Sequence, residues 1–73
     1  MTYNELLIKL KNNHLYPSLL TRVKKNETIL EGLELTTSPL LKDQNIDRVK
    51  EIVGEGFSVD YISTNETIQI KMK

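Results

Sequence analysis

The four residues Asn26-Glu27-Thr28-Ile29 return 39 positions later as Asn65-Glu66-Thr67-Ile68. By chance such a match occurs on the order of a few times in a hundred in so short a chain. The surroundings match as well when residues 1–34 are aligned with residues 40–73. Apolar positions then coincide at Leu7 with Ile46, Leu10 with Val49, Val23 with Ile62, Ile29 with Ile68 and Leu33 with Met72. We therefore interpret the chain as two copies of one structural unit.

The length of 73 residues predicts one domain, close to the lower limit at which a chain without cysteine builds its own core. A domain of this size buries only about 60% of its unfolded surface, so we expect marginal stability unless it dimerises or binds a partner. With 38% hydrophobic and 27% charged residues, the chain is too apolar to be disordered. We expect a single domain over residues 1–73, with repeat halves of about 1–35 and 40–73.

Cysteine is absent, which excludes disulfides, a thiolate nucleophile and a sulfur-ligated zinc site. The first five residues lack the pattern of a secretion signal, and no segment approaches the roughly 20 apolar residues of a membrane span. We therefore expect a cytoplasmic protein that does not contact membranes. The glycosylation pattern at Asn26 and Asn65 requires secretion, so we interpret both sites as hairpin turns.

Helical and strand periodicities alternate in the same order in both halves. In the first half, Thr2 and Glu5 form a capping-box pattern before apolar residues at helical spacing. In the second half, the helix begins either at Ser38 with Pro39 in first position or at Asp43. The elements expected are a helix over about 3–13, strands over 19–24 and 28–35, a helix over about 44–53 with an extra turn in front as an alternative, and strands over 57–62 and 67–72.

Each half is thus a helix followed by a hairpin, and neither half can bury its apolar face alone. The arrangement that buries both is an α+β fold of two layers, in which a duplicated α-β-β unit places two helices on one face of a four-stranded antiparallel sheet. In the strand over 28–35, Gly32 predicts a β-bulge that leaves Glu31 solvated. The strand order stays open, as does a domain-swapped or two-fold dimer.

No residue pattern amounts to a catalytic, cofactor or metal site. His14, the single histidine, is expected to be a partly buried ring at the end of the first helix, because a metal site would need further His or Cys ligands. Gly54-Glu55-Gly56 resembles the start of a dinucleotide fingerprint, but Val59 replaces the third glycine and the motif follows a helix instead of opening one. We expect no enzyme activity, no cofactor and no bound metal.

Charge is distributed unevenly along the chain, although its net value is zero. Five basic residues and no acid lie between Leu6 and Asn26, whereas the segment from Glu27 to Asp60 carries eight acids and three bases. Zero net charge argues against nucleic-acid binding by bulk electrostatics. Basic side chains beside an aromatic ring could nevertheless contact phosphates and stack a base. The candidate binding patch comprises Lys9, Lys11, Tyr16, Arg22, Lys24 and Lys25.

The function expected from these features is that of a small non-enzymatic protein-binding module or accessory and regulatory protein. Opposite charges at its two ends can steer such a domain onto a partner or a second copy, and open sheet edges can accept a partner strand. The alternative is a nucleic-acid-binding domain that uses the basic first hairpin and first helix. Frequent asparagine and lysine are typical of small accessory proteins of phages, mobile elements and low-GC bacteria.

Overall fold

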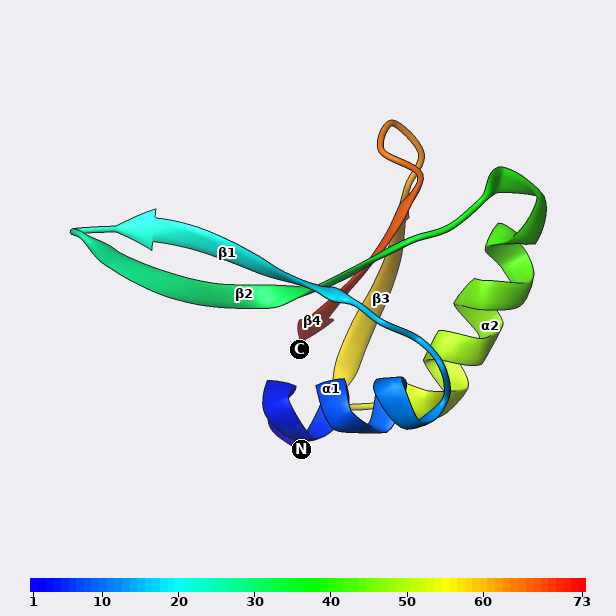
Figure 1. Cartoon of the computed structure of the whole chain (residues 1–73), viewed down its shortest axis with the longest axis horizontal. Coiled ribbons are helices and arrows are strands. Elements are labelled where there is room, and N and C mark those ends of the chain that lie inside the picture. The colour runs from blue at the N-terminus through cyan, green and yellow to red at the C-terminus, as the bar shows by residue number, and fades with distance from the viewer.

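The computed structural model describes the whole chain, residues 1–73, as two helices and one four-stranded antiparallel sheet (Figure 1). The elements are α1 (Tyr3–Asn12), β1 (Ser18–Lys24), β2 (Glu27–Thr36), the 3-10 turn η1 (Pro39–Leu41), α2 (Lys42–Val53), β3 (Phe57–Ile62) and β4 (Thr67–Met72). The expected α+β class is confirmed. The last two strands have the expected bounds, whereas α2 begins two residues earlier than expected.

Local hydrogen bonds define both ends of α1. At its start, the Thr2 hydroxyl accepts from the N–H of Glu5, and the Glu5 carboxylate accepts from the N–H of Thr2. At its end, the N–H groups of His14 and Leu15 donate back to carbonyls of the last turn in a Schellman motif. His14 adopts a φ of 62° just beyond the helix and is exposed. The expectation of a partly buried histidine is wrong, because this left-handed position directs the chain out of the helix and leaves the ring in solvent.

The start of α2 combines features of both predicted starts. The Ser38 hydroxyl accepts from the N–H of Leu40, with Pro39 in the first position of η1, so Ser38 caps the 3-10 turn. Asp43 is not a cap but lies within the first turn of α2, where a carboxylate interacts favourably with the helix dipole. Gly54, with a φ of 73°, ends α2.

The core lies between the two helices and one face of the sheet, whose strand order is β1-β2-β4-β3. Leu33 and Leu35 of β2 stand opposite Ile70 and Ile68 of β4 at its centre. Nine buried apolar residues form this core: Leu6, Leu10, Leu33, Leu35, Val49, Val53, Phe57, Ile68 and Ile70. None of them comes from β1, so this strand is not needed to complete the core.

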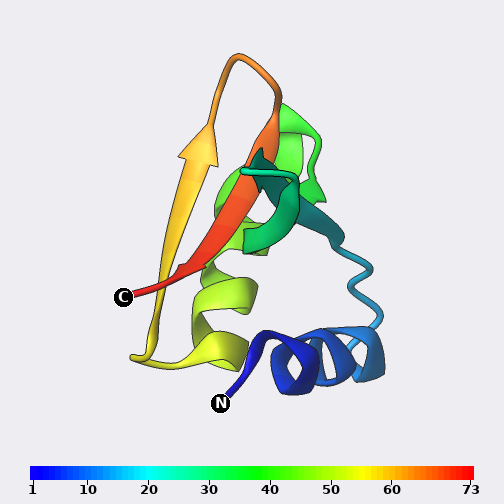
Figure 2. The ribbon, with the colours of Figure 1, turned by 90° about the vertical axis from the view of Figure 1, so that its left-hand side faces the viewer.

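The β1–β2 hairpin extends beyond the rest of the sheet. β4 pairs with β2 only from Leu33 to Thr36, whereas β1 pairs with β2 along its full length. Residues 18–32, here called the arm, therefore project from the body of the molecule, as the left side of Figure 1 shows. Figure 2 views the arm from its tip, with β3 and β4 to its left and α1 below. The radius of gyration is 12.2 Å, against about 11 Å for a compact chain of this length, and the extents are 39 × 28 × 20 Å.

A bulge lies at the base of the arm, as the sequence predicts. Leu20 stands opposite Gly32 and Thr21 opposite Leu30, so Glu31 is an extra residue in β2. The extra residue moves Ile29 to the face away from the helices. Gly32 is required here, because a Cβ atom on it would lie 2.6 Å from the backbone oxygen of Ile70 in β4.

The two hairpins that carry the repeated tetrapeptide differ in geometry. Lys25 and Asn26, with φ angles of 51° and 65°, form a two-residue turn of type I′ in the arm, whereas four residues connect β3 to β4. Ile68 of the second copy is buried in the core, whereas Ile29 of the first is half-buried in the arm. Both halves have the same order of elements, and their origin by duplication stays a prediction.

Candidate functional site

The fold contains no metal-binding cluster and one open hollow. No group of three or more His, Cys, Asp or Glu side chains is placed to hold a metal ion. Neither helix has the length and apolar character that crossing a membrane requires. One open hollow of about 400 Å³ lies beyond the end of α2, and none of the six candidate basic-patch residues lines it. Its lining residues are Lys50, Gly54, Glu55, Phe57, Ser58, Val59 and Lys73.

The structure separates the six candidate residues into two groups. Lys9 and Lys11 occupy the last turn of α1, and Tyr16, which is 67% exposed, follows in the connector to β1. The other three, Arg22, Lys24 and Lys25, lie on the arm, and all six are exposed. The tip of the arm and the C-terminal end of α1 lie on opposite sides of the molecule (Figure 1). The six residues therefore do not form one continuous patch.

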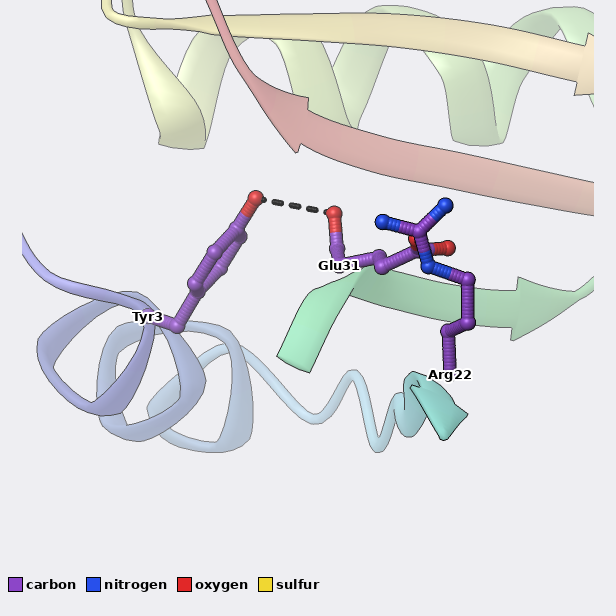
Figure 3. Close-up of polar contacts among 3 residues, drawn as sticks. All are labelled: Tyr3, Arg22 and Glu31. Carbon is purple, nitrogen blue, oxygen red and sulfur yellow. Dashed lines mark hydrogen bonds and ion pairs between the residues drawn. The ribbon is translucent and has the colours of Figure 1, made fainter. Parts of the chain in front are cut away.

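Acidic side chains offset most of the basic charge of the arm. The Nε atom of Arg22 lies 2.7 Å from a carboxylate oxygen of Glu31, with side chains 60% and 30% exposed (Figure 3). Lys24 stands directly opposite Glu27 on the neighbouring strand. Such exposed pairs contribute at most about 1 kcal/mol to stability. With Lys25 at the tip, the arm carries three bases and two acids, which leaves little attraction for phosphate groups.

The arm also carries an apolar face that no helix covers. Leu19 stands opposite the core residue Leu33, and Thr21 and Val23 follow on the same face of β1. Leu19 is 56% exposed and Val23 is 71% exposed, although they lie on the helix side of the sheet. On β2, Leu30 adds a half-buried side chain to this face. The alternation of β1 thus predicts its apolar face correctly, but the body of the molecule does not bury it.

The outer edge of β1 presents backbone groups without a partner. The two-residue turn closes on the pair Lys24–Glu27, whose backbone groups bond to each other. Bonded and non-bonded residues alternate along an antiparallel ladder. Leu19, Thr21 and Val23 therefore direct their N–H and C=O groups away from β2, toward the edge of the sheet. A strand placed along this edge would meet three pairs of free backbone groups beside an apolar face.

The hydroxyl of Tyr3 lies where the arm separates from β4. It donates to the carbonyl of Glu31 at 3.1 Å and accepts from the N–H of Met72 at 2.9 Å; Figure 3 shows the first of these bonds. Glu31 and Met72 would form the next pair of the β2–β4 ladder after Leu33 and Ile70. The phenol thus takes the place of a direct backbone bond, and the ladder ends there.

Sequence reasoning missed this role of Tyr3. Its partners are 28 and 69 positions away, and a tyrosine in the first turn of a helix carries no signal for either. Its ring packs against Phe57 of β3, with 5.9 Å between the ring centroids. α1 is therefore attached at one point to both central strands, where the arm leaves the sheet.

Comparison of the chain with protein-family models, with curated proteins and with solved structures found no match. Function can therefore be inferred only from the geometry and chemistry of the protein itself. Two features coincide on the arm, an apolar face without cover and a strand edge without a partner. The arm is the candidate functional site.

Proposed function

We propose that this protein is a small non-enzymatic interaction module that binds another protein chain through the arm, residues 18–32, in the cytoplasm. The observation that supports the proposal most directly is the position of β1. It is an edge strand in which every residue except Leu20 is exposed, and it contributes nothing to the core. An extended segment of a partner can add to such an edge through main-chain hydrogen bonds.

The apolar face of the arm supplies an energetic reason for binding. Complete burial of an exposed Val or Leu side chain by a partner contributes about 1.5–3 kcal/mol of favourable free energy. Val23 and Leu19 are more than half exposed, so a partner strand with apolar residues in register would gain a part of this from each. Backbone bonds along the edge would add affinity, and the side chains at positions 19, 21 and 23 would select the partner.

Nucleic-acid binding, the alternative, has weaker support from the same observations. The basic residues of the arm and those of α1 are on different sides of the molecule, and Arg22 is paired with Glu31. If nucleic acid is the ligand, replacing Lys24 and Lys25 by glutamate should abolish binding and reduce its salt dependence. Binding that is unchanged in this variant would exclude a role for the arm in nucleic-acid recognition.

Site-specific photo-crosslinking tests the proposal. Benzoylphenylalanine would replace Val23 on the arm or, as the matched control, Ile8 on α1, which is also exposed at 61%. In cells of the native host, we expect a discrete crosslinked protein from position 23 and none from position 8. Equal crosslinking at both positions, or none at position 23, would refute binding through the arm.

A further inference from the structure

We propose that the chain which pairs with the arm is a second copy of this protein, joined β1 to β1 in antiparallel orientation about a two-fold axis at Thr21. The inference deepens the proposed function and rests on it, because it uses the same strand edge. The observation that leads to it is the symmetry of that edge. Leu19 and Val23, whose backbone groups face outward, are equally spaced on either side of Thr21.

Hydrogen bonding favours this register. With Thr21 opposite Thr21 of the second copy, Leu19 stands opposite Val23 and Val23 opposite Leu19. Each of the three outward-facing residues then belongs to a hydrogen-bonded pair. Three is the largest number of such pairs that β1 allows. A register centred on Leu20 forms only the two Leu19–Thr21 pairs, because Val23 would then face Pro17, which has no N–H group.

The avoidance of direct contact between like charges favours this register over one centred on Arg22. Arg22 would stand opposite Leu20 of the second copy, and Lys24 opposite Ser18, so that no two cations face each other. A register centred on Arg22 would instead place two guanidinium groups in direct opposition, which destabilises a strand pair. Arg22 also enters the interface already paired with Glu31, which lowers its repulsion of the other copy.

The apolar face becomes continuous across the two-fold axis. Leu19 and Val23 of each copy form two cross-strand pairs flanking the Thr21 pair, and such apolar pairs stabilise a sheet by roughly 0.2–1 kcal/mol each. The two sheets join into one with eight strands, in the order β3-β4-β2-β1-β1-β2-β4-β3, and all four helices lie on the same side. The contact is isologous, so pairing consumes both β1 edges and closes at two copies.

The expected affinity is modest, because one strand pair of seven residues is a small interface. It falls below the roughly 1,200 Å² of a standard specific complex, so we expect dissociation in the micromolar range or weaker. Sedimentation equilibrium between about 1 µM and about 1 mM should therefore show the mass rising from 8.4 kDa toward twice that value.

A substitution at the centre of the edge tests whether the edge is used. Thr21→Pro removes an outward N–H and places a ring on the edge, and proline is tolerated where the N–H of an edge strand faces solvent. Thr21→Val keeps the backbone donor and is the matched control. We expect Thr21→Pro to weaken dimerisation at least about tenfold and Thr21→Val to retain it, with circular dichroism showing that both are folded. Equal dimerisation in the two variants would overturn the proposal.

Cysteine substitution tests the register and does not depend on the folding of the proline variant. The chain has no cysteine of its own. The two-fold axis sets the Thr21 Cα atoms about 5.5 Å apart, within the range for a disulfide, and keeps the Val23 positions several residues apart. Thr21→Cys should therefore form a disulfide dimer under mild oxidation at least about tenfold faster than Val23→Cys. Equal rates would exclude this register.

The outcomes for self-pairing and for the proposed function are separable. A protein that stays monomeric throughout the concentration range overturns self-pairing. If position 23 then crosslinks to a different protein, binding through the arm stands and only the identity of the partner is wrong. A crosslinked product of twice the 8.4 kDa chain mass supports both proposals.

Discussion

Replacing Tyr3 by phenylalanine should destabilise the protein, because one hydroxyl bonds to two strands. The change removes the bonds to the Glu31 carbonyl and the Met72 N–H and keeps the ring that packs on Phe57. A typical hydrogen bond contributes about 0.5–1.5 kcal/mol net. The bond to Glu31 is partly buried and the bond to Met72 is solvent-exposed, so the sum should be about 1–2 kcal/mol.

A loss of this size is readily measured in so small a domain. Total stability should be about 4–11 kcal/mol at 0.05–0.15 kcal/mol per residue for 73 residues. Each kcal/mol shifts the thermal midpoint of a domain of this size by about 4–8 °C. Thermal and urea unfolding, followed by circular dichroism, give the stability change. Hydrogen exchange of the Met72 amide reports the local effect, and we expect its protection to fall.

Tyr61→Phe is the matched control. Tyr61 is a half-buried tyrosine on β3 whose hydroxyl makes no hydrogen bond to the protein, while its ring lies 5.1 Å from the Lys42 ammonium nitrogen. Removal of this hydroxyl should change the free energy of unfolding by less than about 0.5 kcal/mol. If Tyr3→Phe has an equally small effect and the Met72 amide keeps its protection, the hydroxyl does not connect α1 to the two strands and the reasoning fails.

Substitutions at three further positions test local features of the fold. Gly32→Ala should destabilise by about 1–3 kcal/mol in urea unfolding, because the added methyl would meet the Ile70 carbonyl at 2.6 Å; an unaffected midpoint would show that β4 moves away freely. Asn26→Gly should keep the stability of the hairpin, whereas Asn26→Ala should lose about 1 kcal/mol, since alanine resists a φ of 65°. The backbone N–H of Thr2, and then its hydroxyl, lower the pKa of Glu5 below its ordinary value of 4.5. The resulting stabilisation is present above pH 4.5 and is lost as the pH falls through the lowered pKa. Thr2→Ala removes the hydroxyl and keeps the backbone N–H, so an NMR titration should find a small rise in the Glu5 midpoint, and an unchanged midpoint would contradict a contribution of the hydroxyl.

Local patterns were sufficient to predict the elements and one irregularity of the fold. The bounds of β3 and β4 follow from their period-two alternation, because alternation and turn residues are properties of neighbouring positions. The bulge could be predicted because Gly32 stands next to Glu31, a charged residue that unbroken alternation would place on the same face as Ile29 and Leu33. The exposure of His14 could not be predicted, since a Schellman motif depends on which residue takes the left-handed conformation.

The candidate site was only partly predictable from the sequence. Whether a helix covers a strand face, and which residues lie close together in space, depend on tertiary structure. Apolar residues follow period-two alternation both in β1, at Leu19 and Val23, and in β3, at Phe57 and Val59. Nothing in the local sequence shows that helices cover this face of β3 and leave that of β1 open. Proximity in sequence groups the basic residues of α1 with those of β1. In the fold, β1 carries the chain away from the end of α1 to the tip of the arm, on the opposite side of the molecule (Figure 1).

An exposed apolar edge strand carries a risk of unlimited pairing, and the arm has features that limit it. Arg22 and Lys24 alternate with the apolar residues of β1, and the bulge at Glu31 increases the local twist of the hairpin. The cations disfavour a register centred on Arg22, and the missing N–H of Pro17 disfavours one centred on Leu20, which leaves the register centred on Thr21. The other edge of the sheet, β3, has a different sequence, so pairing of β1 with β3 would be heterologous and would propagate into filaments. A dimer that does not grow at high concentration would therefore indicate that β1 pairs with β1 and not with β3.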